Sequence, residues 1–510
     1  MTQKPFYITT AIDYANGDPH IGHAFEKIGA DAIARYRRLG GETVHFLIGM
    51  DEHGQKVAQA AAAAGVPPQE LVDRIAGVFQ RTWNRLGISN DAFIRTTDTR
   101  HKAGVRALIE RIFQRNPEDF YEKSYEGWYC VGCELFKREG EILDGRCTLH
   151  PTRELEWTIE RNWFFRLTAY EQFLRDHLDR NPSFLEPARR RNEILGLLEG
   201  GLEDISVSRA RLTWAVPFPR PTADGQEQGT WVWFDALPNY LTATGYPDAG
   251  YDALWPAQLH VVGKDITRLH CVVWPAMLRS AGLPLPERVW AHGFVEVGGE
   301  RFSKSAGVKL DLNEAIDRHG ADAFRYFLLR EVPWDGDGNF TLERFDERYT
   351  SDLANDLGNL AHRTVSMIFR YREGVVPSGV ETDLDRSANA TVAKYRDRMG
   401  RYLLHEGLAA AFELVSEANA FVETQAPWRL AKDPSRKAEL DEALASLVRS
   451  LAVTAALLFP FMPGKMEQLW TQLGSARPIA QLDELPGLKT YGWTPTVAAV
   501  LFPRPELETR

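Results

Sequence analysis

The stretch YANGDPHIGHAFE, residues 14–26, joins a strand to a helix and decides the fold of the N-terminal part of the chain. The preceding segment PFYITTAI, residues 5–12, is rich in β-branched and aromatic residues, which is typical of a buried strand, and NGDP is typical of a turn. From Ile21 the apolar residues recur at helical spacing until the Gly-Gly pair at 40–41, and TVHFLIG, residues 43–49, indicates a second strand. A unit of strand, helix and strand predicts an α/β fold with a parallel sheet of Rossmann type.

Two histidines, His20 and His23, begin the predicted helix beside the carboxyl ends of the strands, where doubly wound folds bind their ligands. Backbone N–H groups and the helix dipole favour a phosphate at this position. Imidazoles at positions i and i+3 point the same way and can donate hydrogen bonds to one anion. The alternatives are that they cap the helix or form half of a metal site, and the pair alone leaves these functions open.

The composition is that of an ordinary globular protein. The 510 residues are 44% hydrophobic and 25% charged, with a formal net charge of −10. This charge argues against a broadly basic coat for nucleic acid but allows a local basic face for an RNA ligand. Neither a membrane-spanning run nor a signal peptide is evident, and the 4 cysteines do not form a secreted disulfide framework, so we expect a cytoplasmic protein.

The periodicity along the chain predicts four segments. Strand and helix signals alternate over residues 1–115, which we assign to the first half of the Rossmann-type domain. Short strands, turns and aromatics over 116–220 indicate an inserted module, and alternation resumes over 221–340 with TWVWFDAL, LHVVGKD and VWAHGFVEV. Residues 341–510 carry long helical periodicities, which predict an all-α domain with a C-terminal tail. DGDGN faintly resembles a calcium loop, but Phe340 stands where that loop needs Gly, so we predict a linker turn.

The sharpest local signal is CVGCELFKREGEILDGRCTLH. Cys130 and Cys133 form one close pair, and Cys147 and His150 form another thirteen residues further on. Two close pairs of soft ligands suit tetrahedral Zn²⁺, and a closed set of three cysteines and one histidine leaves no open position for catalysis. The motif therefore predicts a structural zinc knuckle, and reduced core cysteines are the alternative.

A second signal is GGERFSKSAG, in which a glycine-rich hairpin leads into Arg301, Ser303, Lys304 and Ser305. Two cations and two hydroxyls on flexible backbone suit a mobile clamp on a polyphosphate whose charge shifts during a reaction. A solvated basic loop has the same composition and is the alternative.

A third signal is a set of polar residues at predicted strand ends, surrounded by aromatic residues. The polar residues are Asp51, Asp235, Lys264, Asp265 and His270, and the aromatic residues are Tyr14, Trp233 and Tyr240. A carboxylate near aromatic walls would hold an ammonium group and leave room for an apolar side chain. Taken singly, such aromatic residues more often belong to the core.

The motif HIGH, residues 20–23, after a first strand and RFSKS, residues 301–305, after a later one together resemble the two signatures of class I aminoacyl-tRNA synthetases. Six further motifs resemble the methionyl-tRNA synthetase family in their order along the chain: TTAIDYANGDPHIGHA, MDEHG, VWFDALPNY, GKDITRLH, DLGNLAHRT and QAPW. The span between the two signatures lacks the large editing domain of the leucine, isoleucine and valine enzymes. The resemblance implies ATP-dependent attachment of methionine to tRNA(Met) through a methionyl-adenylate, with release of AMP and diphosphate.

The resemblance also assigns residues to substrates. For methionine they are Ile12, Tyr14, Asp51, Trp233, Ala236, Leu237, Tyr240, Ile266 and His270, with Asp51 on the ammonium group. For ATP they are His20, Gly22, His23, Arg301, Ser303, Lys304 and Ser305, of which His20, His23 and Lys304 are expected to be catalytic. For the anticodon they are Asn359, Arg363 and Trp428, although spacing alone favours a packing role for the tryptophan and a surface charge for the arginine.

The same resemblance implies one structural Zn²⁺ on Cys130, Cys133, Cys147 and His150, Mg²⁺ bound with ATP, and a helical anticodon-binding domain. A monomer is expected, since the chain stops soon after the helices without an appended dimerisation domain. The chain departs from the family at Arg301 and Phe302, where Lys-Met is usual, and a guanidinium is not equivalent to an ammonium group. Asp13 stands where many relatives have Pro or Tyr, and the sequence gives no reason for it.

Two rival functions share part of this pattern. A nucleotidyltransferase with the histidine signature would make a small adenylylated product without tRNA, but it predicts no large helical C-terminal domain. A non-catalytic RNA-binding protein with a zinc knuckle would not need both phosphate signatures. Both signatures and the helical periodicity after residue 345 therefore favour the synthetase.

Overall fold

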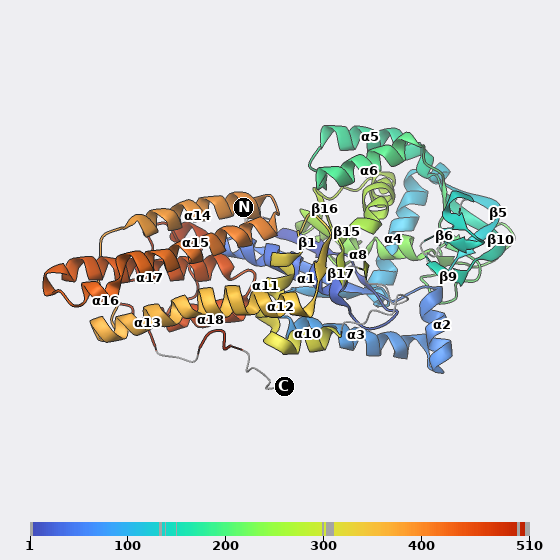
Figure 1. The fold of residues 1–510 in the computed structure, drawn as a ribbon. Helices are drawn as coiled ribbons and strands as arrows, with labels where there is room; N and C mark the ends of the chain where they lie inside the picture. Colours follow the sequence, from blue (N-terminus) through green and yellow to red (C-terminus); the bar gives the residue numbers. More distant parts are fainter. Residues whose placement is uncertain are drawn as a thin grey trace.

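A parallel β-sheet forms the centre of the protein (Figure 1). The structure is a computed structural model that describes residues 4–131, 135–137, 139–148, 150–297, 300–301, 311–496 and 500–504. Over these residues the strand order is β11-β16-β15-β1-β3-β2, with β4 also paired to β3, and each pair is parallel. The strands are β1 (Phe6–Thr10), β2 (Asp13–Tyr14), β3 (Val44–Asp51), β4 (Ala92–Arg95), β11 (Leu185–Glu186), β15 (Leu259–Gly263) and β16 (Val289–His292). The predicted α/β fold with a parallel sheet is confirmed.

Helices cover both faces of this sheet because side chains alternate along its strands. The main covering helices are α1 (Ile21–Leu39), α3 (Pro68–Arg85), α4 (Thr99–Arg115) and α9 (Trp274–Ala281). Phe6 and Ile8 of β1 belong to the same hydrophobic cluster as the buried side chains of α1 and α3. Tyr7, which lies between them in β1, belongs to the cluster that includes α4 and α9. Helix α1 begins after His20 and ends at Gly40, as its apolar spacing predicts.

The segment after α4 contains a long antiparallel ribbon followed by two helices. These elements are β5 (Phe120–Cys130), β10 (Glu156–Phe165), α5 (Glu171–Arg180) and α6 (Ala188–Glu199). The prediction of short strands and turns throughout this segment is wrong for α5 and α6. Leu174 and Leu178 lie four residues apart in α5 and are buried, which is a helical pattern. Strand β11, between the two helices, pairs with β16 at the edge of the central sheet.

The segment TWVWFDAL differs from its expected structure. The prediction that Asp235 ends a strand is wrong, because this residue lies in a short helix, α7 (Val232–Ala236), which is followed by α8 (Asn239–Thr242). A short apolar run without clear periodicity fits a buried strand or a buried helix equally well. The helical conformation buries the Asp235 carboxylate against His53 and His101, at 2.6 and 2.9 Å.

The C-terminal part is helical, as predicted, and extends to one side of the sheet in Figure 1. Its helices are α10 (Leu312–His319), α11 (Ala321–Glu331), α12 (Leu342–Arg348), the π-helix η7 (Tyr349–Gly358), α13 (Asn359–Arg372), α14 (Asp383–Gly400), α15 (Leu404–Gln425), α16 (Pro427–Leu430), α17 (Lys437–Leu458) and α18 (Pro463–Gln472). The prediction of a linker turn for DGDGN, residues 335–339, is wrong for its last two residues, which belong to a short strand, β19 (Gly338–Phe340). This strand pairs with β17 (Val295–Val297).

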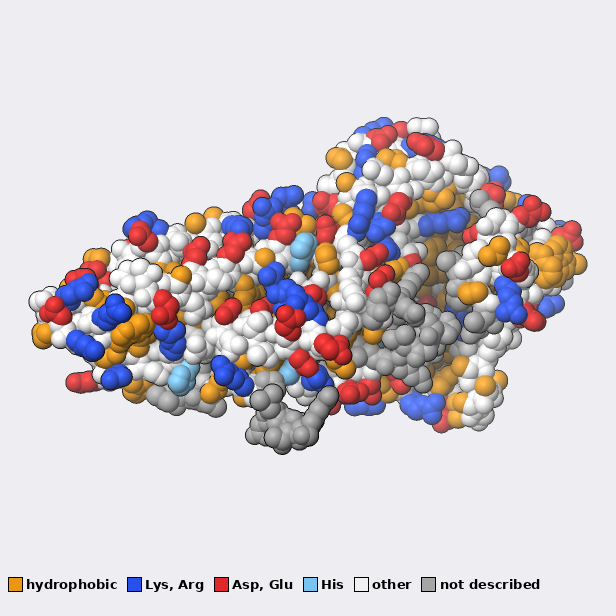
Figure 2. Space-filling model, in the orientation of Figure 1, with side chains coloured by type: hydrophobic (Ala, Val, Ile, Leu, Met, Phe, Trp, Pro, Cys, Tyr) orange, Lys and Arg blue, Asp and Glu red, His pale blue; other side chains and the backbone are white. Residues whose placement is uncertain are grey.

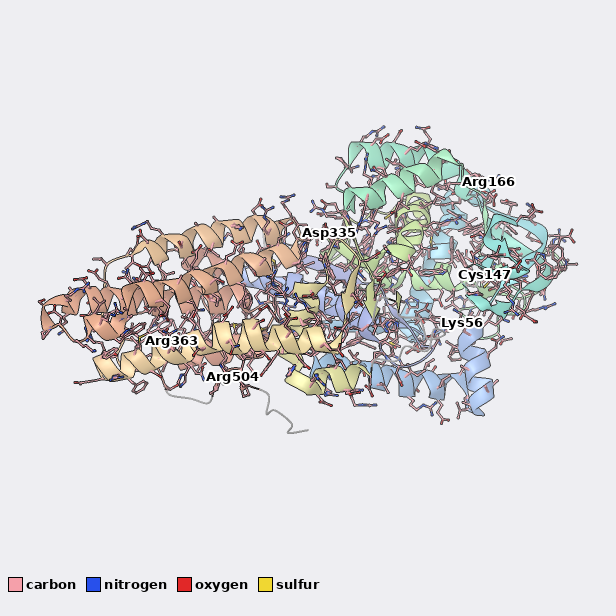
Figure 3. All side chains as sticks on the ribbon, in the orientation of Figure 1. Lys56, Cys147, Arg166, Asp335, Arg363 and Arg504 are labelled. Atoms are coloured by element: carbon pink, nitrogen blue, oxygen red, sulfur yellow. The ribbon has the colours of Figure 1, made fainter. Side chains whose placement is uncertain are left out.

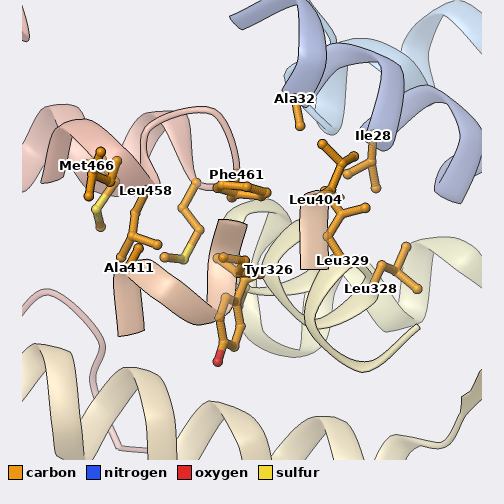
Figure 4. Close-up of a cluster of buried hydrophobic side chains, with 14 of the residues drawn as sticks. Ile28, Ala32, Tyr326, Leu328, Leu329, Leu404, Ala411, Leu458, Phe461 and Met466 are labelled. Atoms are coloured by element: carbon orange, nitrogen blue, oxygen red, sulfur yellow. The ribbon is translucent and has the colours of Figure 1, made fainter. Parts of the chain in front are cut away.

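One hydrophobic cluster joins α1 to the helical part. Ile28 and Ala32 of α1 lie in it with Leu328 and Leu329 of α11 and with Leu404 of α15 (Figure 4). Because the cluster also includes buried side chains of α17 and α18, the sheet and the helices share one core.

A buried arginine reinforces this junction. Arg325 of α11 is fully buried, and its guanidinium donates to the Asp31 carboxylate of α1 at 2.7 Å. It also donates to the carbonyl oxygens of Leu86, Pro460 and Phe461 at 3.1, 2.9 and 2.9 Å. The planar guanidinium has donors enough for all of these acceptors, so the buried charge is paired and hydrogen-bonded.

The surface carries both signs of charge. Acidic and basic side chains are interspersed over the visible face of the helical part, without a single basic field (Figure 2). Within the described ranges, no helix combines the length and the apolar character that crossing a membrane requires.

Candidate active site

A cleft of about 470 Å³ lies where β1, β3, β15 and β16 end. Its wall includes residues that follow β1, the last residue of β3, the last residue of β15 and the last residue of β16, which is the edge where doubly wound folds bind ligands. The residues proposed for methionine and the first signature that line it are Ile12, Tyr14, His20, Gly22, His23, Asp51, Trp233, Ala236, Leu237, Tyr240, Ile266 and His270. The fold therefore gathers into one cleft residues that are far apart in the sequence.

His20 and His23 cap helix α1 through one nitrogen of each ring. His20 Nδ1 accepts from the backbone N–H groups of Gly22 and His23 at 3.2 and 3.4 Å, and His23 Nδ1 accepts from the His20 N–H at 3.3 Å. The two rings stack with centroids 3.6 Å apart. Since both Nδ1 atoms accept, the proton of each neutral ring is on Nε2. The capping and anion-binding interpretations are therefore compatible, because they use different nitrogens.

The opposite end of the cleft is apolar and contains a fixed neutral histidine. His270 Nδ1 donates to the Ile266 carbonyl at 3.0 Å, and its Nε2 accepts from the Tyr240 hydroxyl at 2.6 Å. Burial lowers the pKa of His270 to about 4, so the ring is neutral near pH 7. The ring of Trp233 meets the His270 ring edge to face, with centroids 6.4 Å apart. These contacts define an aromatic slot whose wall contains the hydrogen bond between the Tyr240 hydroxyl and His270 Nε2.

Asp51 also lines the cleft. It is the last residue of β3, is 8% exposed, and pairs in register with Tyr14 of β2. The backbone N–H of Ala15 donates to the Asp51 carbonyl at 2.8 Å. This ladder fixes the carboxylate next to the Tyr14 ring, a suitable position for an ammonium group.

Two of the predicted polar residues lie elsewhere. Asp235 does not line the cleft, since both of its carboxylate oxygens accept from His53 and His101. Burial alone would raise the pKa of Asp235, but these histidines lower it to about 2. The Lys264 ammonium pairs with Asp337 and lies 4.4 Å from the Phe294 ring centroid. Both residues brace the cleft wall from outside.

A buried charge network beneath the cleft is absent from the sequence-based prediction. The fully buried Lys27 ammonium donates to Asp13 at 2.9 Å, to Glu26 at 2.8 Å and to the Ala11 carbonyl at 2.9 Å. Glu26 also pairs with His292 at 3.2 Å. Burial raises the pKa of Asp13 to about 7 although Lys27 opposes this shift. The unusual Asp13 is thus explained as the partner of a buried lysine.

Sequence reasoning also missed the wall formed after β15 and β16. The missed residues that line the cleft are Gly263, His292, Gly293, Phe294 and Val295, and they lie beside Asp265, which belongs to the third sequence signal. A β-carbon on Gly293 would lie 1.9 Å from the Gly336 carbonyl oxygen, so only glycine allows this close backbone approach. A carboxylate directly after a sheet strand, as in GKD, is the sequence signal that identifies Asp265.

The second signature follows this wall. Strand β17 pairs antiparallel with β18 (Glu300–Arg301), so the expected hairpin begins next to Val295 of the cleft. The side chain of Arg301 and residues 302–310, which include Ser303, Lys304 and Ser305, lie outside the described residues.

Two of the four candidate metal ligands are described. Cys130 ends β5 and Cys147 ends β8 (Arg146–Cys147), and both are fully buried in one small cluster with Leu155 and Ile142. The backbone of His150, the first residue of β9 (His150–Glu154), pairs in register with Cys147. Cys133 and the side chain of His150 lie outside the described residues. The described residues contain no complete metal-ligand cluster.

The candidate anticodon residues lie together at the far end of the helical part, where Figure 3 labels Arg363. Asn359 begins α13, and Arg363 follows one turn later. The Arg363 guanidinium lies 5.8 Å from the centroid of the Trp428 ring and pairs with Glu423 at 2.6 Å. Trp428 is half-buried on α16, so one part of its ring packs on the core.

The fold and the cleft, with a histidine pair at the N-terminus of α1, define a class I aminoacyl-tRNA synthetase, and the family model described as "tRNA synthetases class I (M)" matches residues 6–154 and 136–365. A methionine–tRNA ligase of Rhizobium meliloti is 44% identical over 98% of this chain and 98% of its own length. The chain therefore belongs to the methionyl-tRNA synthetase family. A ligase of Caldanaerobacter subterraneus is 41% identical over 99% of this chain and 80% of its own length.

A solved structure agrees with this assignment. Mycobacterium tuberculosis methionyl-tRNA synthetase in complex with methionyl-adenylate is 41% identical to the chain. The match has a TM-score of 0.93 and covers 98% of this chain and 100% of that structure.

Proposed function

We propose that the cleft forms methionyl-adenylate from methionine and ATP and that the chain then transfers the methionyl group to tRNA(Met). The single observation that supports this site most strongly is the convergence of His20 and His23 with Asp51 and the aromatic slot. The carboxylate oxygen of methionine attacks the α-phosphorus, and the bond to diphosphate breaks as diphosphate leaves with the bonding electrons. The terminal ribose hydroxyl of the tRNA then attacks the acyl carbon and displaces AMP.

The methionine end of the cleft suits its substrate. Asp51 accepts hydrogen bonds from the ammonium group, and Ile12 contributes backbone nearby. The thioether chain occupies the slot of Tyr14, Trp233, Ala236, Leu237, Tyr240, Ile266 and His270. Sulfur packs favourably against aromatic edges, and a flexible unbranched chain fills an irregular slot. A neutral His270 presents no charge to that chain.

The phosphates of ATP belong at the N-terminus of α1. His20 and His23 donate from Nε2, and the backbone at Gly22 lets the nucleotide approach closely. From the hairpin, Arg301, Ser303, Lys304 and Ser305 supply cations and hydroxyls that close over the phosphates. Asp265, which also lines the cleft, would accept hydrogen bonds from ribose hydroxyls. Mg²⁺ enters with ATP on the phosphate oxygens and neutralises part of their charge.

We infer a structural zinc on Cys130, Cys133, Cys147 and His150. The observation in its favour is that Cys130 and Cys147 are buried together and that, among the described residues, their cluster contains few other side chains, so a metal cross-link would add stability to this module. A closed site of four ligands supplies no catalytic position. Metal analysis should find one zinc per chain, and Cys130→Ser should loosen the module and impair transfer to tRNA more than adenylate formation. Protein purified without chelator and found to contain no metal would refute this assignment.

The remaining assignments stay predictions. Asn359, Arg363 and Trp428 are proposed to read the anticodon, and the four segments 1–115, 116–220, 221–340 and 341–510 are proposed as the domain divisions. A cytoplasmic monomer is expected, and size-exclusion chromatography with light scattering measures the oligomeric state directly.

The decisive experiment is ATP–diphosphate exchange with each of the twenty amino acids. We expect strong exchange with methionine and little with leucine or isoleucine, because their branched chains do not fit the slot. His23→Ala and Lys304→Ala should each reduce exchange by about two orders of magnitude, the effect of removing one donor or charge aimed at a transition state. Equal exchange with leucine would overturn the choice of amino acid, and wild-type exchange by the Lys304 variant would exclude its role as a clamp.

A further inference from the structure

The described wall of the cleft has an uneven charge. It contains four carboxylates, of which Asp13 and Glu26 pair with the buried Lys27 beneath the wall, and the other two are those of Asp51 and Asp265. Lys56 is the one lysine or arginine that lines the wall among the residues that the structure describes. Both substrates are anionic at the reacting atoms, because methionine presents a carboxylate and ATP presents phosphates. A cation on this wall is therefore in a position to counter the repulsion between substrate and protein.

Lys56 lies at the same corner of the cleft as the ammonium site. Its ammonium lies 5.4 Å from the centroid of the Tyr14 ring, and the side chain is half-buried. Tyr14 of β2 pairs in register with Asp51 of β3, so the residue whose ring Lys56 contacts is the strand neighbour of Asp51. An amino acid whose ammonium meets Asp51 carries its carboxylate on the adjacent carbon, within the same corner.

The position of Lys56 is unfavourable for the helix that carries it. Lys56 is the second residue of α2 (Gln55–Ala64), and Figure 3 labels it near the end of α2 that adjoins the rest of the catalytic part. A cation in the first turn opposes the positive end of the helix dipole. Gly54 at the N-cap provides no side-chain cap, and the first turn contains no acidic residue. A residue that local stability disfavours, placed in a cleft, indicates a role in binding.

We propose that Lys56 binds the carboxylate of methionine while Asp51 binds its ammonium group. This inference rests on the proposed function of the cleft. The two side chains hold both charges of the zwitterion, which leaves one carboxylate oxygen for attack on the α-phosphorus. In that step the C–O–P bond forms, the bond between the α-phosphorus and diphosphate breaks, and Lys56 stays on the oxygen that becomes the acyl carbonyl. No proton is transferred.

The test compares two probes that differ at the carboxylate. Isothermal titration of the full chain with methionine and with methioninol, which carries a hydroxyl group instead, separates binding of the carboxylate from binding of the rest. Lys56→Met should weaken methionine binding by about 10- to 100-fold, the range for a lost charge-assisted hydrogen bond, and leave methioninol binding within about twofold. Lys56→Arg should restore part of the affinity. Lys102→Met, on α4 and away from the cleft wall, is the matched control and should bind both probes as the wild type does.

Each other outcome has a defined meaning. The inference would be overturned if Lys56→Met weakened the binding of methionine and methioninol equally, or weakened the binding of neither. An increase in the KM for ATP alone would also overturn it, because phosphate would then be the partner of Lys56. Because a cation leaves the first turn of α2, the urea midpoint of Lys56→Met should be unchanged or higher, and methioninol binding shows that the variant is folded. Wild-type protein without methionine-dependent exchange would refute the proposed function itself, which is a result distinct from a failure of the Lys56 variant.

Discussion

Trp428→Ala tests whether the far end of the helical part reads the anticodon. The ring is half-buried, so its inner part packs on the core and its outer part is available to a base. Stacking of one base on an aromatic ring contributes about 1–3 kcal/mol, which corresponds to about a 5- to 150-fold loss in charging efficiency. The Arg363 guanidinium already pairs with Glu423 on an exposed surface, so loss of its contact with the ring adds little. We therefore expect aminoacylation of tRNA(Met), measured as kcat/KM for tRNA, to fall within this range.

ATP–diphosphate exchange without tRNA shows whether Trp428→Ala affects tRNA recognition or the stability of the whole protein. ATP–diphosphate exchange needs no tRNA, so the Trp428 variant should retain wild-type exchange. Trp493→Ala is the matched control, because Trp493 is also half-buried against the same core. It should lower the urea midpoint about as much as Trp428→Ala does and leave tRNA charging unchanged. If Trp428→Ala charged tRNA normally, or lost exchange and charging together, the residue would be part of the core and the anticodon assignment would be wrong.

Three further predictions concern buried polar groups. Tyr240→Phe removes the hydroxyl that donates to His270, and the buried nitrogen that loses its partner costs about 1–3 kcal/mol. The KM for methionine in exchange should therefore rise while the KM for ATP stays constant. Equal increases in both KM values would contradict this prediction. The pKa of Asp235 is lowered from 3.8 to about 2, so its contribution of about 2 kcal/mol is present above pH 4 and lost as the pH falls toward 2. Urea unfolding should therefore show that Asp235→Asn is less stable than wild type at pH 7 and that this difference narrows below pH 4; a constant difference would exclude the ionised carboxylate as its source. Arg325→Met leaves Asp31 with Arg35 as its remaining ion-pair partner and removes the donor to three carbonyl oxygens, so it should lower the free energy of unfolding by about 3–5 kcal/mol. A loss below about 1 kcal/mol would show that the buried guanidinium is not needed.

Local patterns predicted the elements that carry the first signature. The strand before the loop, the helix from Ile21 to the glycine pair and the strand after it follow from hydrophobic periodicity and turn chemistry, and the structure has all three. The strand prediction for VWFDAL was wrong because an apolar run of this length has no dominant period. In the helical conformation Asp235 meets His53, which is 182 positions away in the sequence, and no local pattern contains that contact.

Some residues of the candidate site could be predicted from the sequence and others could not. The family resemblance predicted twelve residues that line the cleft, from Ile12 to His270. The pairing of Asp13 with Lys27 could not be predicted, because a lysine in a helix pattern is expected at the surface and becomes buried only when β2 packs beside α1. Lys56 was not predicted for a related reason. In the sequence, a lysine after MDEHG cannot be told from the many surface lysines, and only the structure shows that it lines the cleft.

Helix α1 determines how the two ends of the molecule work together. Its N-terminus presents His20 and His23 to the cleft, and its buried face packs through Ile28 and Ala32 on the helices that lead to Trp428. Large hydrophobic junctions hold domains in one orientation, whereas small polar ones allow them to move. A shared core, reinforced by the buried Arg325, therefore sets the distance between the cleft and the residues proposed for the anticodon. A tRNA that binds the far end of the helical part is positioned by this fixed geometry, so loss of Trp428 should reduce docking of the tRNA without altering the chemistry at the histidine pair.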